Sequence, residues 1–201
     1  FSSSVQSQIV DPVFTSESRC EFRLADRGAA FMSSLRLGNL GLSATDATIK
    51  LYHSGPGGAC IIDRIQLLDG TEELDGLRNV AQWLTFKYSL QSNSQNHNVF
   101  NNMMGSDIGK ATGATGEILS DITKMVRNGD AQSLTTLDLR DVFPLLQNLT
   151  HLSTKMFKNL RVVIEYHNSI PFLLNDQNVN ISNYKKSVPI LIVDEIVDSA
   201  L

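Results

Sequence analysis

Residues 157–166 read Phe157-Lys-Asn-Leu-Arg-Val-Val-Ile-Glu-Tyr166 and carry the clearest strand pattern in the chain. Apolar residues occupy every second position, with mostly polar residues between them: Leu160, Val162, Ile164 and Tyr166. A period of two predicts a β-strand that turns one face toward a core. Upstream, Leu137-Asp-Leu-Arg-Asp-Val-Phe-Pro-Leu-Leu146 predicts a short amphipathic turn over residues 141–146. A short turn followed by a half-buried strand is therefore expected here.

Further strand signals extend outward from this segment in both directions. They lie at residues 20–24, 31–37, 47–51, 60–68, 117–123, 133–139 and 188–193. The strand at 60–68 is apolar on most of both faces and is expected to be central, and the strand at 188–193 is expected to be buried on both faces. No repeated strand–helix alternation exists, which excludes a parallel α/β sheet. The pattern predicts an all-β fold, a jelly-roll β-sandwich of eight or more antiparallel strands with one inserted helix and long loops.

A hairpin and a helix are predicted in the middle of the chain. Asp69-Gly70 is expected to form a type I′ turn, with a short return strand over residues 71–74. The period then changes to that of a helix, with Asp75 available as the N-cap. The predicted helical stripe consists of Leu77, Val80, Ala81, Leu84 and Tyr88. This is the one helix expected to interrupt the strand pattern.

The predicted domain organisation is a single domain with an extension at each end. Residues 1–18 are rich in Ser and Gln and are expected to form an extended arm that orders only against a neighbour. Residues 19–198 are expected to form one jelly-roll domain, and 199–201 a tail that leads to a second jelly roll. The polar segment 91–115 is far longer than an ordinary connection, which marks it as functional or mobile.

Composition limits the classes of function. The 201 residues are 42% hydrophobic and 19% charged, which is typical of a folded globular domain. A net charge of −4 without a clustered basic face argues against direct nucleic-acid binding. Cys20 and Cys60 lie within apolar strand patterns and are expected to be buried free thiols, which suits a reducing compartment. No apolar run has the length of a transmembrane segment.

The residue types that carry chemistry are scattered rather than clustered. The four histidines, His53, His97, His151 and His167, have no partner at metal-ligand spacing. Glu72, Glu73 and Asp75 flank the expected helix start, where acidic side chains favour the helix dipole. The remaining candidate for a cation site is the acidic group Asp194, Glu195 and Asp198, with a solvated linker as the simpler interpretation. We therefore predict no catalytic, cofactor-binding or metal-binding residue, and no enzyme.

Two sets of residues remain as candidates for binding partners. Apolar side chains on segments expected to be helix surface or loop are predicted to contact neighbouring subunits: Trp83, Phe86, Met103, Met104 and Phe172. Residues 93–102, with His97 and Phe100, are the only candidate for a sugar-binding loop. A carbohydrate- or receptor-binding β-sandwich is thus the alternative from another class of function.

The order and spacing of several segments resemble the N-terminal jelly roll of double jelly-roll viral major capsid proteins, the lineage of adenovirus, virophage, polinton and giant-virus shells. The resemblance is carried by Phe22-Arg-Leu24, Asp63-Arg-Ile-Gln-Leu-Leu-Asp-Gly70, the following helix, the turn at 139–146, Asn159-Leu-Arg-Val-Val-Ile-Glu-Tyr166 and Pro189-Ile-Leu-Ile-Val-Asp-Glu195. The main departure is length, because a full double jelly-roll protein is longer than this chain. A single-jelly-roll penton or minor capsid protein is therefore the alternative within this class.

The resemblance implies a structural role in a virus particle. It implies a chain that assembles an icosahedral shell as part of a pseudo-hexagonal trimeric capsomer, without a cofactor. The expected partners are other copies of the chain, in a homotrimer, and neighbouring capsid, penton or minor cement proteins. The expected location is the capsid shell of the virion, assembled in the host cytoplasm or nucleus.

Overall fold

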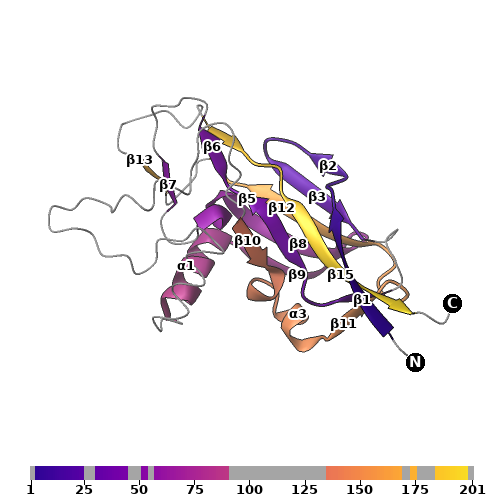
Figure 1. Cartoon of the computed structure of the whole chain (residues 1–201). Coiled ribbons are helices and arrows are strands. Elements are labelled where there is room, and N and C mark those ends of the chain that lie inside the picture. Colours follow the sequence, from indigo (N-terminus) through magenta and orange to yellow (C-terminus); the bar gives the residue numbers. More distant parts are fainter. Residues whose placement is uncertain are drawn as a thin grey trace.

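Two antiparallel sheets pack against each other in the computed structural model, which describes residues 3–24, 30–44, 51–53, 57–90, 135–168, 173–175 and 184–198 (Figure 1). The first sheet contains, in spatial order, β10 (Thr135–Asp138), β5 (Arg36–Leu40), β15 (Ile190–Asp198), β4 (Ala30–Met32) and β11 (His151–Ser153), with β1 (Ser3–Val10) also paired to β15. The second sheet contains β2 (Phe14–Thr15), β3 (Arg19–Arg23), β12 (Leu160–Tyr166), β8 (Ile62–Asp69) and β9 (Glu72–Arg78).

The strands pair in a nested order along the chain. β1 pairs with β15, β3 with β12, β5 with β10, and β8 with β9, all antiparallel. Contacts of β15 with β5 and of β12 with β8 join these pairs into the two sheets. A long antiparallel ribbon folded over on itself in this way is a jelly roll. The predicted all-β jelly-roll sandwich is therefore confirmed.

The core lies between the inner faces of the two sheets. Strand β12 supplies the four side chains predicted from its alternation, and all four are buried. Phe22 of β3, in the second sheet, and Phe31 of β4, in the first sheet, are both fully buried in this cluster. Phe143, which precedes the short helix α3 (Pro144–Asn148), belongs to the same cluster. Burial of this apolar area is the main stabilising contribution to the sandwich.

The helix α1 (Val80–Leu90) is the inserted helix expected from the sequence, but its start differs from the prediction. Strand β9 continues to Arg78, because its pairing with β8 extends through Gly76 and Leu77. Asn79 then adopts a positive φ of 55°, and its carbonyl accepts the first helical hydrogen bond, from the Trp83 N–H. Asp75 therefore lies in β9 and is not the N-cap of α1.

The hairpin between β8 and β9 is present, but one residue later than predicted. Asp69 pairs with Glu72, so the two central residues are Gly70 and Thr71. Gly70 has a φ of +64°, whereas Thr71 is not among the residues with positive φ. Positive φ at the first central residue alone is the signature of a type II′ turn, not the predicted type I′. The start of β8 also differs, because Gly57–Ile61 forms a short 3₁₀ helix, η1.

The prediction of an N-terminal arm was wrong for residues 3–10. These residues form β1, which pairs with β15 in an unbroken register from Ser3 opposite Asp198 to Val10 opposite Leu191. β1 is therefore the first strand of the jelly roll, within the same chain. The start of β1 and the end of β15 lie together at one end of the sandwich (Figure 1).

Two small ribbons and the helix α1 lie at the opposite end (Figure 1). The ribbons pair β6 (Leu42–Ala44) with β14 (Tyr184–Lys186), and β7 (Leu51–His53) with β13 (Leu173–Asn175). The predicted strand at 117–123 and the polar segment 91–115 lie outside the described residues, as does most of the strand predicted at 47–51. The amphipathic turn expected at 141–146 is present as a 3₁₀ helix, η3 (Leu139–Asp141), followed by α3.

Candidate functional site

The outer face of the second sheet is charged, and its charges are paired with one another. Arg19 and Arg161 each place a guanidinium nitrogen 2.8 Å from a carboxylate oxygen of Glu21. Arg64 lies 2.9 Å from Glu73 across the β8–β9 hairpin. Because these groups are partly exposed, each pair contributes little to stability. This face is therefore suited to exposure to solvent.

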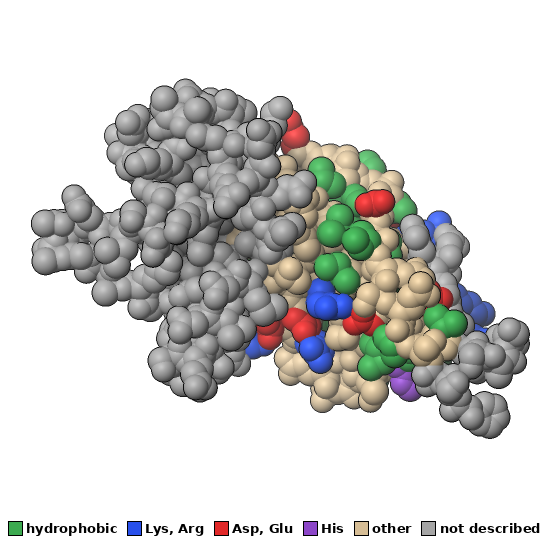
Figure 2. Space-filling view, viewed as in Figure 1, with side chains coloured by type: hydrophobic (Ala, Val, Ile, Leu, Met, Phe, Trp, Pro, Cys, Tyr) green, Lys and Arg blue, Asp and Glu red, His purple; other side chains and the backbone are tan. Residues whose placement is uncertain are grey.

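The outer face of the first sheet carries a group of apolar side chains. Val5 and Ile9 of β1 lie opposite Ile196 and Ile192 of β15, and Val5 and Ile9 are 57% and 62% exposed. Ile190, Ile192 and Ile196 are only partly buried. Figure 2 shows hydrophobic side chains gathered over the region where β15 runs in Figure 1. The expectation that the strand at 188–193 is buried on both faces was wrong: Leu191 and Val193 are buried in the core, but Val188 is 52% exposed and Ile190 and Ile192 are only partly buried.

Gly38 of β5 explains how the isoleucines lie on this face. A Cβ atom at Gly38 would be 3.2 Å from Ile190 Cγ1 and 3.3 Å from Ile192 Cδ1. These contacts are tighter than ordinary packing, so the two isoleucine side chains extend over the glycine backbone. The apolar surface thus continues from β1 across β15 to β5.

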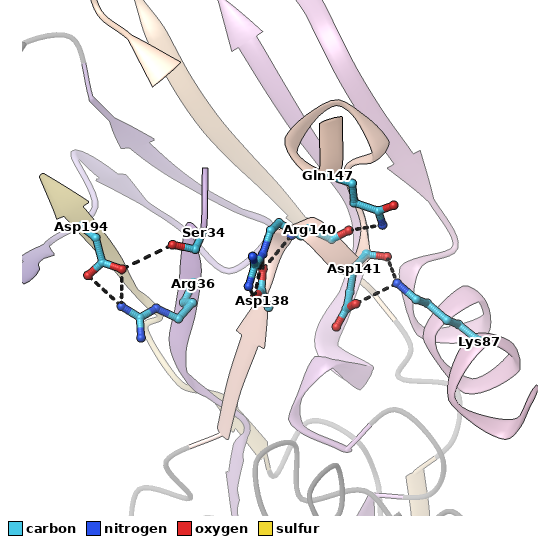
Figure 3. A network of polar contacts seen from close by, with 8 residues as sticks. All are labelled: Ser34, Arg36, Lys87, Asp138, Arg140, Asp141, Gln147 and Asp194. Carbon is cyan, nitrogen blue, oxygen red and sulfur yellow. Dashed lines mark hydrogen bonds and ion pairs between the residues drawn. The ribbon is translucent and has the colours of Figure 1, made fainter. Parts of the chain in front are cut away.

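A polar network crosses the same sheet (Figure 3). The Arg36 guanidinium donates to both carboxylate oxygens of Asp194 at 2.9 Å, and the Ser7 hydroxyl donates to Asp194 Oδ1 at 2.5 Å. Ser34 also donates to Asp194, at 3.4 Å. These contacts connect β5, β15 and β1, because the three side chains share the outer face. Because partly exposed ion pairs contribute little to stability, the main effect of these contacts is to define which residues of β1 and β15 lie opposite each other.

The helix α1 presents a second apolar surface. Trp83 and Phe86 are 42% and 58% exposed, their ring centroids are 6.4 Å apart, and Leu90 is also exposed. The helix is held against η3 by Lys87, whose ammonium lies 2.8 Å from Asp141 Oδ1 (Figure 3). Trp83 Nε1 also donates a hydrogen bond of 3.3 Å to the Asp141 carbonyl. The aromatic face of α1 is therefore anchored at one edge and open to solvent. Met103, Met104 and Phe172, predicted to act with it, lie outside the described residues.

The acidic group near the C-terminus does not converge on a cation. Asp194 and Glu195 are neighbours on a strand, so their side chains point to opposite faces of the sheet. Asp194 is bound to Arg36, and Glu195 accepts a hydrogen bond from the Gln8 amide. Within the described residues, no three His, Cys, Asp or Glu side chains are grouped as metal ligands. The cation hypothesis for Asp194, Glu195 and Asp198 therefore finds no support.

The described histidines lie on different segments and belong to no group of metal ligands. His167 Nδ1 lies 3.7 Å from Asp63 Oδ1 at the end of β12, and His151 is exposed on β11. Burial lowers the pKa of His167, with Asp63 opposing this and Lys186 adding to it. His53 lies in β7, and His97 lies outside the described residues, as does the candidate sugar-binding loop at 93–102.

Asp75 has a structural role that the sequence pattern did not predict. Its Oδ2 accepts a hydrogen bond of 2.9 Å from the Leu145 N–H in the first turn of α3, and its Oδ1 accepts one from the Gly76 N–H. The carboxylate therefore caps α3, which is distant in sequence, rather than α1. Glu73 accepts hydrogen bonds from Arg64 and Gln66. Asp75 and Glu73 therefore both have structural roles.

Both cysteines are buried free thiols, as predicted. Burial raises the pKa of Cys20 to about 11 and that of Cys60 to about 12. The Cys20 thiol is hydrogen-bonded to the Tyr166 side chain, whose pKa is also raised by burial. A thiol acts as a nucleophile only as the thiolate, so neither group is suited to covalent catalysis at neutral pH.

The described helices include none that is long and apolar enough to cross a membrane.

Comparison with known proteins gives a match of structure without a match of sequence. No protein-family model matches the chain, and no curated protein sequence matches it. The PBCV-1 virus capsid matches with a TM-score of 0.58 and 10% identity, over 98% of this chain and 43% of the other. The Faustovirus major capsid protein matches with a TM-score of 0.52 and 9% identity, over 99% of this chain and 55% of the other. The chain thus spans about half the length of these two viral capsid proteins, and what it shares with them is the jelly-roll fold.

Proposed function

We propose that the chain is a structural subunit of a virus shell and that it catalyses no reaction. The observation that carries this proposal is the likeness of fold over nearly the whole chain to viral capsid structures. The surfaces support it as well. One outer face carries paired charges, and the other carries exposed apolar side chains beside the Arg36–Asp194 ion pair; an exposed apolar group of this kind marks a surface for a partner. A structural subunit of a shell needs contacts with its neighbours and a rigid fold rather than a reactive site.

The finer parts of the proposal follow from the resemblance seen in the sequence. The shell is icosahedral, and the chain contributes the first of two jelly rolls to a trimeric, pseudo-hexagonal capsomer. The matched capsid proteins are about twice as long as the matched region, which leaves room in them for a second domain. Other copies, penton proteins and minor cement proteins are the partners, and the virion is the location. A single-jelly-roll penton or minor protein is the alternative.

The aromatic face of α1, formed by Trp83, Phe86 and Leu90, is proposed to contact a neighbouring subunit. The test substitutes Phe86→Lys in the full-length protein that carries this chain. Phe86 is exposed in the single subunit, so the variant should melt like the wild type while its capsomers or particles are lost. Gln82→Lys, on the same helix and also exposed, is the matched control. Sedimentation and electron microscopy measure assembly.

Two results would contradict the proposal at different levels. Normal particles from Phe86→Lys would remove α1 from the interface and leave the shell function standing. A wild-type protein that forms no higher assembly at any concentration, alone or with other shell proteins, would contradict the shell function itself.

A further inference from the structure

Strand β1 has one edge that is unpaired within the described part of the chain. Ser3–Val10 pairs with β15 along its whole length, and no described strand pairs with its other side. The backbone N–H and C=O groups on the free side of an edge strand can pair with another strand. The partner that this edge recognises is therefore an extended segment of polypeptide.

The other described sheet edges carry features that discourage such pairing. β10 has a register shift between Thr135 and Leu137 and carries the Asp138–Arg140 ion pair beside its end. β9 contains several charged residues and also faces a register shift in β8. The remaining edge strands are only two or three residues long: β2, β6, β7, β11, β13 and β14. Short strands, charges and irregular register are the usual means by which proteins block edge pairing.

β1 has none of these features. Its sequence, Ser-Ser-Val-Gln-Ser-Gln-Ile-Val, contains no charged residue and no proline, and its register with β15 is unbroken over eight residues. Its outward-facing Val5 and Ile9 are more than half exposed. Among the described strands, β1 is therefore the long edge that is open to a partner.

The sequence of β1 indicates what that partner is. Residues 5–9 read Val-Gln-Ser-Gln-Ile, which is nearly a palindrome about Ser7. When such a strand pairs antiparallel with its own copy, centred on Ser7, each residue meets a similar one. Val5 lies opposite Ile9 of the second copy, Gln6 opposite Gln8, and Ser7 opposite Ser7. Cross-strand pairs of this kind stabilise a sheet, and no like charges oppose each other.

We propose that β1 is a self-recognition edge, through which two copies of the chain join their first sheets into one continuous sheet across a two-fold axis at Ser7. Val5, Ser7 and Ile9 share one face in both copies, so the apolar outer surface continues from one subunit into the next. The interface is isologous, which is the commonest arrangement in symmetric dimers. It needs only two copies of the chain and does not depend on the proposed shell function.

Paired charge substitutions test both the partner and the register. In the double variant Val5→Lys/Ile9→Lys, two lysines oppose each other twice in the proposed dimer. In Val5→Lys/Ile9→Glu, each lysine opposes a glutamate instead. We expect the like-charge variant to self-associate at least about tenfold more weakly than the opposite-charge variant, with the difference reduced in high salt. Sedimentation of the chain over a concentration series measures this, and melting curves check that both variants fold.

Cysteine cross-linking tests the same geometry without adding charge. Opposed residues of antiparallel strands have Cα atoms about 4.5–5.5 Å apart, which suits a disulfide. Ser7→Cys should therefore give disulfide-linked dimers on oxidation. Ser4→Cys is the matched control, since the two copies of residue 4 would lie about 20 Å apart. The native Cys20 and Cys60 are fully buried and do not compete.

Three results would overturn the proposal. They are equal self-association of the two charge variants, equal cross-linking by Ser7→Cys and Ser4→Cys, and a wild-type chain whose mass does not change with concentration up to high levels. Weak association of the like-charge variant together with selective cross-linking at Ser7 would support it.

Discussion

Gly70 is the residue where a single added methyl group gives the sharpest test of the fold. It is the first central residue of the β8–β9 hairpin and has a φ of +64°. An L-residue in the left-handed region is disfavoured by about 1–2 kcal/mol. The only neighbour of an added Cβ atom is Asn159 Nδ2 at 3.9 Å, which is an ordinary contact. The loss on substitution therefore comes from backbone conformation and not from a clash.

Gly70 makes its hydrogen bonds through its backbone, so a substitution leaves both groups in place. The Gly70 N–H donates to the Asn159 carbonyl at 2.9 Å, and the Gly70 carbonyl accepts from Arg161. Gly70→Ala should thus lower the free energy of unfolding by about 1–2 kcal/mol. Gly70→Val should lower it further because a β-branched residue is more restricted, and Gly70→Asn should lower it less because Asn tolerates positive φ.

Urea denaturation followed by far-UV circular dichroism measures these differences through the transition midpoint. Thr71→Ala, at the exposed second central residue, is the control and should change stability by no more than about 0.5 kcal/mol. If Gly70→Ala melts like the wild type, or if Ala and Asn are equal at this position, the turn assignment is refuted.

Three further predictions concern side chains that are partly or fully buried: Asp75, the two cysteines and His167. Asp75→Ala should cost about 1 kcal/mol, since it removes the cap from the Leu145 N–H, while Asp75→Asn should retain much of it; equal urea midpoints for both variants would contradict the capping role. The pKa values of Cys20 and Cys60, about 11 and about 12, lie above the ordinary 9.0, so both thiols should resist a thiol reagent at pH 8 until the chain unfolds, and stability should fall as the pH rises above 9. The pKa of His167 is lowered by burial, so its contribution to stability is present above the ordinary value of 6.5 and is lost as the pH falls below it. His167→Gln should flatten that part of the melting profile, and an unchanged acid dependence would show that another group is responsible.

The strands that the sequence predicts well are those with one face in the core. In β12, Arg161 and Glu165 are partly exposed on one face and Leu160, Val162, Ile164 and Tyr166 are buried on the other, as the alternation predicts; Val163, on the face of Arg161 and Glu165, is the exception, because it is also buried. The buried thiols and the exposure of Trp83 and Phe86 were predictable for the same reason. Each depends on local pattern.

β1 was not predicted, because its apolar side chains lie mostly on the face that points away from the core. Its apolar Val5 and Ile9 face outward, and only Val10 reaches the core, so no half-buried alternation is visible. What holds β1 in place is backbone pairing with β15, at the other end of the sequence. Such a pairing leaves no local signal.

The apolar outer face of the first sheet was missed for a related reason. The run Ile190-Leu-Ile-Val193 is continuous, and a continuous apolar run predicts burial on both faces. Only the register with β1 and the close approach over Gly38 reveal that Ile190 and Ile192 lie on an open surface. The cap provided by Asp75 is likewise a contact between distant segments, and no local pattern reports it.

The nested pairing of the strands also orders the events of folding. The β8–β9 hairpin closes the shortest loop, and each pair outside it closes a longer one, ending with β1 and β15. Because contacts between distant residues form slowly, the outermost pair is the last to gain its hydrogen bonds. During synthesis on the ribosome β1 emerges before the other described strands, yet it must wait for β15, the last of them. Through that interval both of its edges are open, so strand exchange between nascent chains is the characteristic misfolding hazard of this topology.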